Sequence, residues 1–193
     1  MSWEWRKQVA VWGRWLHIYL SMASFAILFF FAVTGLTLNH PDWFGSKESA
    51  RSLKGQSAAG PCDQARLELV EHLRKTHGVR GALSDYRVDD TQCAVSFRGP
   101  GYTADAFVDR ATGRYEMTET RMGWVAVVND LHKGRDSGRV WFWLIDLSAV
   151  LMVLVSLTGM VLIFFLGKKR SSGLIAALAG TVVCLAIYAI WVP

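Results

Sequence analysis

The feature that most constrains this chain is the placement of its charged residues. No Asp, Glu, Lys or Arg occurs in three stretches, 15–41, 147–167 and 171–193, which contain 27, 21 and 23 residues. A helix of roughly 20 apolar residues spans the ~30 Å hydrocarbon layer of a bilayer. The sequence therefore predicts three transmembrane helices. It excludes a soluble protein with one core and a classical multi-domain soluble enzyme.

The uncharged stretches divide the chain into segments. The central block of about 90 residues is long enough for one small domain. The first stretch is longer than the 7–15 apolar residues of a signal peptide, and no clear cleavage site follows it, so we expect a retained anchor. The expected segments are an N-terminus at 1–14, a transmembrane helix at 15–41, a domain at 42–139, a second helix at 140–167, a loop at 168–170 and a third helix at 171–193.

The net charge of +5 predicts the orientation of these segments. Of the 21 Lys and Arg residues, 15 lie in the central block with 14 of the 16 Asp and Glu residues, so that block is nearly neutral. The other basic residues precede the first helix or form the short loop, which the positive-inside rule places in the cytoplasm. We expect a bacterial inner-membrane protein with a periplasmic domain and C-terminus. This distribution argues against a nucleic-acid partner.

The central block reads as a small α+β module. Gly60 and Pro61 open a predicted helix that ends at His77, with Gly78 just beyond it. Alternation of apolar residues predicts strands at 93–98 and 102–109, and a turn leads to a further strand at 114–117. An amphipathic helix is expected at 122–132, and the polar segment 46–59 reads as a flexible linker. The block lacks a GxSxG elbow, a P-loop, an HExxH motif and a CxxC motif.

Two cysteines, Cys62 and Cys93, lie in the predicted periplasmic block, where a disulfide is chemically permitted. Two separate buried thiols are an equal alternative, because sequence does not give the Cα separation. Cys184 lies in the third apolar stretch.

Three of the five histidines lie at the predicted membrane edges, whereas His72 and His77 are expected to be exposed on the module's helix. His40 ends the first transmembrane helix and His132 precedes the second, so both belong at the outer interface. Two neutral imidazoles on facing helices are what axial ligation of a b-type haem requires. The alternative for each is a hydrogen bond to a backbone carbonyl or a lipid headgroup.

His17 lies near the inner edge, about 34 Å along the helix from His40 at 1.5 Å per residue, so these two cannot share one iron. An inner haem would need Met160 or a second protomer as partner. Covalent c-type attachment is excluded, since no CxxCH motif occurs. A simple hydrogen bond to a carbonyl or headgroup is the alternative for His17.

Asp146 is the one charged residue inside a predicted span. We expect it to pair with Lys133 or Arg139, or to contact a hydroxyl when protonated. A structural contact and a role in proton or metal handling both remain open. The two Thr-Gly steps, Thr34-Gly35 and Thr158-Gly159, are expected to let helices approach closely.

Several short motifs together resemble PepSY-associated transmembrane proteins. They are Trp15-Leu16-His17, Thr34-Gly35-Leu36, Val108-Asp109 followed by Thr112-Gly113, Leu131-His132-Lys133-Gly134 and Leu157-Thr158-Gly159. The similarity runs in order over nearly the whole chain. In that family an α+β PepSY module lies between the first two helices, and some larger relatives are membrane reductases that bind b haems through histidines.

The resemblance implies a b-type haem electron-transfer protein that is a component of a ferric or other periplasmic reductase system, with His40, His132 and His17 as the histidines concerned. The chain has fewer spans and histidines than those reductases, and no flavin or nicotinamide motif. Its electron donor would therefore be a quinol or a partner subunit, and its acceptor a periplasmic protein or ion. The alternative is a non-enzymatic anchor that presents the PepSY module to a periplasmic partner. Small residues in the third stretch suggest a homodimer.

Overall fold

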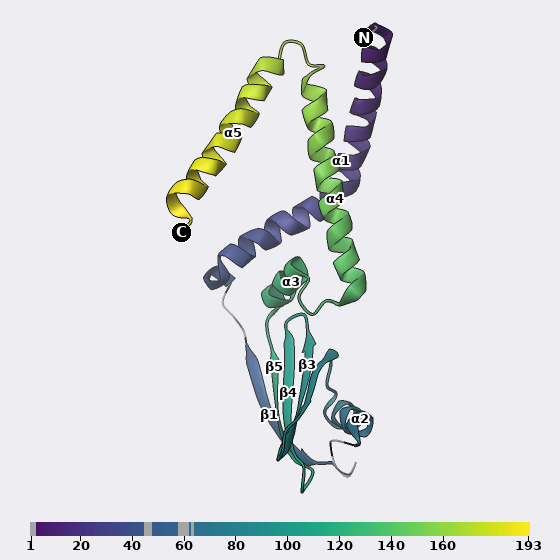
Figure 1. Ribbon diagram of the computed structural model, residues 1–193, viewed down its shortest axis with the longest axis vertical. Coiled ribbons are helices and arrows are strands. Elements are labelled where there is room, and N and C mark those ends of the chain that lie inside the picture. The colour runs from purple at the N-terminus through teal and green to yellow at the C-terminus, as the bar shows by residue number, and fades with distance from the viewer. Residues whose placement is uncertain (1–2, 45–47, 58–61, 63) are drawn as a thin grey trace. The chain divides into compact units, whose positions relative to one another are not determined.

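The computed structural model describes residues 3–44, 48–57, 62 and 64–193 (Figure 1). Three of its helices are apolar and long enough to cross a bilayer, with mean hydropathies of 2.1 to 2.3 in their most apolar windows. The chain is thus a multi-pass membrane protein. These helices are α1 (Trp3–Asn39), α4 (Gly138–Ile163) and α5 (Arg170–Trp191).

The chain forms two compact units, which are described separately. One contains the residues up to Phe29 and those from Asp146 onward, and the other contains Phe30–Ile145. In the first unit α4 ends at Ile163, before the uncharged stretch does. The amides of Phe164 and Phe165 bond carbonyls three residues back, which is the tight turn that often finishes a helix. None of the residues of α5 is buried, as expected of a helix that faces lipid.

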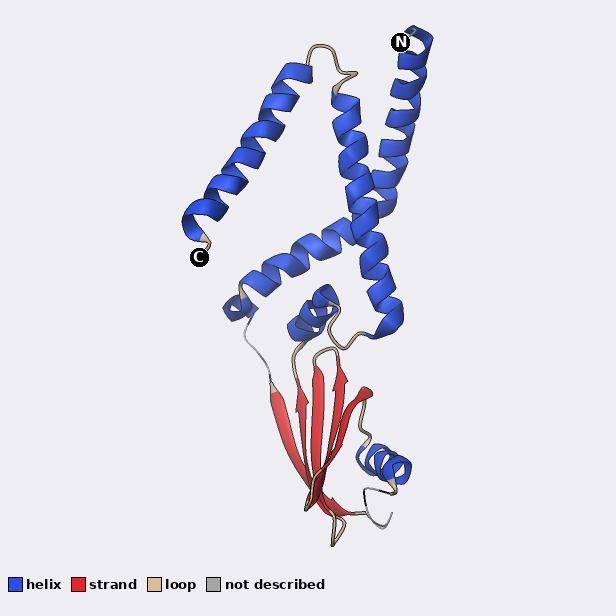
Figure 2. Ribbon diagram, in the orientation of Figure 1, coloured by secondary structure: helices blue, strands red, loops and turns tan. Residues whose placement is uncertain are grey.

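The second unit is built on a five-stranded antiparallel sheet (Figure 2). The order in space is β1-β5-β4-β3-β2, so the first two strands of the sequence form the two edges. Helix α2 (Arg66–His77) packs on one face of the sheet, while the short η1 (Pro41–Phe44) follows α1 and α3 (Trp124–Lys133) follows the last strand. The strands are β1 (Ser49–Gln56), β2 (Ala82–Val88), β3 (Gln92–Gly99), β4 (Tyr102–Asp109) and β5 (Arg114–Arg121).

The core of this unit lies between α2 and the inner face of the sheet. Every second residue of β3 is buried, including Val95 and Phe97, which the predicted alternation requires. On α2, Leu69 and Leu73 are buried one turn apart. Gly78 ends the helix in the left-handed conformation, φ 65°, and its amide bonds Arg74 O at 2.9 Å. The predicted helix end and the predicted strands at 93–98 and 102–109 are confirmed as parts of α2, β3 and β4.

Helix α2 crosses the sheet from one edge strand toward the other. Near its start the guanidinium of Arg66 lies 4.9 Å from the ring centroid of Tyr86 in β2. At its end His77 contacts Tyr115 in β5. The direction of the helix therefore places its C-terminal histidines over β5, beside the β1 edge.

Two expectations for this block are wrong. Residues 49–56, expected to be part of a flexible linker, form β1, and β2 was not expected at all. Both are edge strands whose side chains are mostly exposed, so they lack the alternation that marks a half-buried strand. Their backbone hydrogen bonds come from pairing with β5 and β3, and β5 is distant from β1 in the sequence. The start proposed at Gly60 and Pro61 for the helix lies outside the described residues.

Cys62 and Cys93 form a disulfide, with their Cα atoms 6.3 Å apart. The bond ties the segment before α2 to the middle of the sheet. The alternative of two separate thiols is thereby excluded.

Candidate functional site

The imidazole of His132 packs against α1 at the first Thr-Gly step. Its Nδ1 atom lies 2.6 Å from Oγ1 of Thr34, and its ring lies edge-on to Phe31 at 5.1 Å. A Cβ atom at Gly35 would lie 3.6 Å from the ring. The small residue therefore leaves room for the imidazole beside the threonine hydroxyl.

The hydrogen bonds of the Thr34 hydroxyl indicate the tautomer of His132. The Thr34 hydroxyl donates to Phe30 O at 2.7 Å, in the ordinary pattern of a helical threonine. A hydroxyl has one proton, and with that proton donated to Phe30 O, Oγ1 accepts from the imidazole, so we assign the proton of His132 to Nδ1. Nε2 then carries a free lone pair.

His17 repeats this arrangement in the other unit. Its Nδ1 lies 3.0 Å from Oγ1 of Thr158, whose hydroxyl donates to Leu154 O at 2.8 Å. A Cβ atom at Gly159 would lie 3.2 Å from the ring. Both Thr-Gly steps thus hold an imidazole that donates from Nδ1 and leaves Nε2 free.

Burial keeps the imidazole of His132 neutral. The pKa of this side chain is lowered from its ordinary value, mainly by burial and secondarily by the neighbouring Lys133. A neutral imidazole with one protonated nitrogen is the form in which histidine serves as a metal ligand or a hydrogen-bond acceptor.

His40 occupies a different environment at the end of α1. Its ring stacks on Trp43, with centroids 3.8 Å apart and planes 7° from parallel. Its amide bonds Leu36 O at 3.1 Å, so the helical turn continues to this residue. At about 100° per residue, the direction of His40 differs by roughly 120° or more from those of Thr34 and Gly35. The structure therefore does not bring His40 to the side of α1 that contacts His132.

Helix α3 makes a row of polar contacts on both sides. Asn129 Oδ1 accepts from the Thr37 hydroxyl at 2.6 Å, and the carbonyl of Leu131 accepts from the Trp141 indole at 2.8 Å. The buried Asp130 accepts from the Gly101 amide in the β3–β4 turn at 2.9 Å. Four consecutive residues, 129–132, thus fasten α3 to α1, to the sheet and to the start of α4.

The side chain of Asp130 is also paired with a cation. Its Oδ1 atom lies 3.0 Å from Nη2 of Arg135, while its Oδ2 holds the Gly101 amide. A Cβ atom at Gly101 would lie 2.5 Å from Val127, so the β3–β4 turn packs directly on α3. The charge of the buried carboxylate is thereby compensated on both oxygens.

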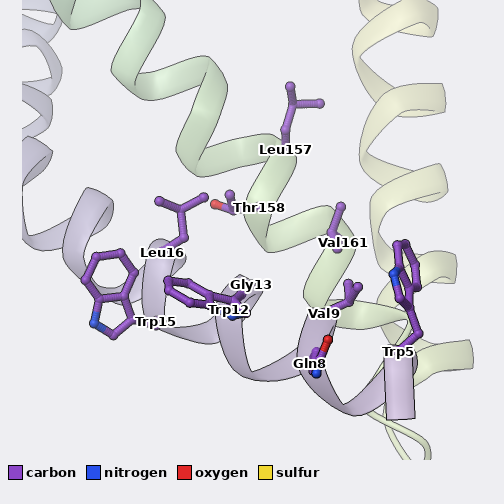
Figure 3. Close-up of a pocket in the computed structure, with 10 residues that line it drawn as sticks. All are labelled: Trp5, Gln8, Val9, Trp12, Gly13, Trp15, Leu16, Leu157, Thr158 and Val161. Carbon is purple, nitrogen blue, oxygen red and sulfur yellow. The ribbon is translucent and has the colours of Figure 1, made fainter. Parts of the chain in front are cut away.

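A cavity of about 620 Å³ lies in the first unit between the start of α1 and the end of α4 (Figure 3). The indoles of Trp5, Trp12 and Trp15 line it, with Gln8 and Thr158 as its polar members. Because the Thr158 hydroxyl already bonds His17 and Leu154, the Gln8 amide is the main polar group facing the cavity. Its lining suits an apolar or aromatic group.

The sequence was compared with protein families, curated proteins and solved structures. The sequence model of the PepSY_TM-like family matches residues 11–193. The chain belongs to this family. No curated protein and no solved structure matches it. The structure agrees with this membership, because it combines three apolar helices with a small antiparallel sheet.

Asp146 lies on α4 of the PepSY_TM-like chain, and its side chain is exposed. Exposure of a carboxylate on an apolar helix is costly in hydrocarbon, so such residues usually have a partner. Its pairing with Lys133 or Arg139 stays a prediction.

Two histidines of the PepSY_TM-like sheet unit were misjudged from sequence. His72 and His77 were expected to be exposed, yet both are half-buried, and their Nε2 atoms lie 3.4 and 2.8 Å from the Tyr115 hydroxyl. Because the helix turns about 100° per residue, positions five apart do not share a face. His72 and His77 both reach the hydroxyl oxygen of Tyr115 because that residue lies between them. The local sequence does not indicate this position of Tyr115.

Proposed function

We propose that this protein is a membrane electron-transfer protein that binds a b-type haem near the outer end of α1. The observation that carries the proposal is the hydrogen bond of His132 to Thr34. Histidines that ligate metals almost always donate their other ring proton to a fixed acceptor, which sets the tautomer and the ring orientation. His132 meets that condition and presents Nε2 as a free ligand atom.

His40 is our candidate for the second axial ligand. It ends α1 six residues after Thr34, about 9 Å along the helix axis, and its ring nitrogens make no hydrogen bond within the described residues. His40 lies on another side of α1 from His132 in this structure, so in this role the last turn of α1 would have to change its path as the ring leaves Trp43. The second ligand is therefore the part of the proposal that mutagenesis tests most directly.

Bound haem would supply one-electron transfer. The donor would be a quinol or a partner subunit, and the acceptor would lie on the outer side. The residues of this chain would bind and orient it. Thr34 fixes the His132 ring, Phe31 packs edge-on against it, and Trp141 packs edge-on against Phe30. His17 has the same free Nε2 at the opposite end, and we propose it as an inner ligand in a homodimer.

An optical spectrum tests the proposal. Protein purified after haem-replete expression should show a Soret band and, after dithionite, the sharp visible bands of a low-spin b haem. His132→Ala should abolish them, and His40→Ala should convert the spectrum to that of a haem with one lost axial ligand. Asn129→Ala is the matched control, because it removes a contact between α3 and α1 without removing an imidazole. A wild-type sample without haem would refute the proposal.

The contacts of α3 favour a second candidate, a non-enzymatic anchor that presents the PepSY-like sheet to a partner outside the membrane. Residues 129–131 fasten the sheet to the helices through Thr37, Gly101 and Trp141, which would hold the sheet at a fixed distance from the bilayer. This function predicts that His40→Ala and His132→Ala leave partner binding intact. Substitutions on the exposed face of the sheet should abolish it.

A further inference from the structure

Two imidazoles and a phenol converge at the end of α2. The Nε2 atoms of His77 and His72 lie 2.8 and 3.4 Å from Oη of Tyr115, which belongs to β5. Both imidazoles stand edge-on to the phenol ring, with centroid distances of 5.6 and 5.8 Å. Three potential ligand atoms from two elements therefore point to one small volume.

Their spacing matches that of atoms bound to one metal ion. With metal–nitrogen bonds of about 2.0–2.1 Å, neighbouring ligand atoms lie roughly 2.9 Å apart in a square-planar site and 3.4 Å apart in a tetrahedral one. The observed distances of 2.8 and 3.4 Å from Oη fall at these values.

Tyr115 is held in this position by the strand beside it. It faces Gly55 of β1 in the sheet register, and a Cβ atom at Gly55 would lie 2.4 Å from the phenol oxygen. Only a residue without a side chain allows the ring to lie across β1 and meet α2. The ring is 4% exposed, whereas the two histidines are half-buried and open to solvent.

Burial favours the uncharged form of the phenol, because it raises the pKa of Tyr115, so a bound metal ion would have to displace the phenol proton. Burial, and secondarily His72, lowers the pKa of His77. The charged groups that act on it are Glu119, which attracts a cation, and Arg51, which opposes one. Arg121 bonds the Glu119 carboxylate at 2.7 Å and compensates much of its charge.

We propose that His72, His77 and Tyr115 form a binding site for a divalent transition-metal ion, with Cu²⁺ bound more tightly than Zn²⁺. Imidazole nitrogens favour these ions over Mg²⁺ and Ca²⁺, which prefer oxygen ligands, and affinities for such a set rise to Cu²⁺. Among the described residues no three His, Cys, Asp or Glu side chains form a metal cluster, so the phenol is an essential member. Water completes the coordination.

Binding of the metal ion releases one proton from the cluster. Without metal, the phenol oxygen accepts from one imidazole Nε2–H and donates its own proton to the other Nε2. With metal, the first imidazole carries its proton on Nδ1 instead, and the phenol proton is released to solvent. Binding therefore strengthens as pH rises. The site lies in the sheet unit and does not depend on the haem proposal.

Copper titration of the full chain in detergent tests the site. The wild type should bind one equivalent of Cu²⁺ with an electron paramagnetic resonance spectrum that shows coupling to two imidazole nitrogens, and Cu²⁺ should raise its unfolding temperature. Loss of a supporting residue near a metal costs about 10- to 100-fold in affinity, and loss of a direct ligand should cost more. We therefore expect His72→Gln with His77→Gln to weaken binding by more than 100-fold, and Tyr115→Phe to weaken it by at least tenfold.

The control is Glu71→Gln, an exposed residue of the same helix, which should leave the affinity unchanged. His17, His40 and His132 remain in every variant, so copper bound to them would persist in the double variant with the same spectrum. That result would overturn the proposal, as would a wild type that binds no copper. Circular dichroism and the unfolding temperature of the metal-free variants show that they are folded, and Gly55→Ala, which displaces the phenol without removing a ligand, should weaken binding as well.

Discussion

Nδ1 of His132 donates to Oγ1 of Thr34 across 2.6 Å, and Nδ1 of His17 donates in the same way to Thr158 across 3.0 Å. In each case the threonine is followed by a glycine that leaves room for the ring. One chain thus contains two imidazoles with the same fixed tautomer, each in a different unit. This repetition indicates that the Thr-Gly steps select an imidazole, in addition to permitting close helix packing.

Thr34→Val tests the contribution of this hydrogen bond. The substitution keeps the shape of the side chain but leaves the Nδ1–H of His132 without its acceptor, and we expect it to lower the free energy of unfolding by about 1 kcal/mol. Thermal unfolding in detergent measures the loss. Thr181→Val is the control, because Thr181 makes the same bond to a carbonyl four residues back and its side chain is exposed. Equal effects of the two substitutions would show that the imidazole contact contributes nothing.

The packing of the β3–β4 turn on α3 can be separated from backbone strain. Gly78 and Gly101 have nearly the same φ, 65° and 64°, but only Gly101 has a neighbour, Val127, within reach of a Cβ atom. Gly78→Ala should cost about 1 kcal/mol for the left-handed conformation alone. Gly101→Ala should cost clearly more and should increase hydrogen exchange in α3. An equal loss of stability in the two variants would show that the β3–β4 turn does not pack against Val127 of α3.

Removal of the carboxylate of Asp130 should loosen the same contact from the other side. Asp130→Ala leaves the Gly101 amide without its acceptor and Arg135 without its partner, which we expect to destabilise the protein by about 2 to 3 kcal/mol. Calorimetry in detergent measures the change. Asp136→Asn, in the loop after α3, is the control with an unchanged unfolding temperature.

The disulfide should contribute strongly to the stability of the sheet unit. Cys62 and Cys93 are separated by 31 positions, and closing a loop of this length stabilises the folded state by about 3 to 4 kcal/mol in the chain-entropy treatment. Replacing both cysteines by serine should lower the unfolding temperature, and dithiothreitol should then have no further effect. Cys184→Ser should behave as the wild type.

Stability should fall as the pH falls through the ordinary histidine range. The pKa of His77 in the folded chain is below its ordinary value of 6.5, so the unfolded chain takes up a proton first. The stabilisation is complete above pH 6.5 and is lost between that pH and the lower pKa of the folded form. His132 acts in the same direction. His77→Gln and His132→Gln should each reduce the dependence of the free energy of unfolding on pH. Unfolding measured at several values between pH 5 and 8 checks this.

Sequence patterns predicted the elements that have a strong local signal. The uncharged stretches indicated three apolar helices, and the alternation in residues 93–98 and 102–109 indicated β3 and β4, two of the three inner strands. The edge strands β1 and β2 were missed, because their side chains are mostly exposed and their partners are set by the tertiary fold.

The candidate site was predictable in residue type but not in pairing. The ends of the uncharged stretches and the distribution of basic residues predicted that His40 and His132 lie at one membrane edge, but they did not reveal that Thr34 is the partner of His132 or that Trp43 covers His40. Likewise, His72 and His77 were recognised as helical but not as neighbours of Tyr115. Contacts between elements distant in sequence depend on how the helices and the sheet pack, which the local pattern does not specify.

Gly55 has a consequence for the alignment of β1. This strand pairs with β5 so that Gly55 faces Tyr115 and Arg51 faces the buried Glu119. A shift by one residue would bring the side chain of Lys54 or Gln56 against the phenol and would leave Glu119 opposite Ala50 or Ser52, without its second cation. The register of β1, whose sequence has no clear strand pattern, is thus set by two pairs across the strands. Gly55 leaves room for Tyr115, and Arg51 faces the buried carboxylate of Glu119.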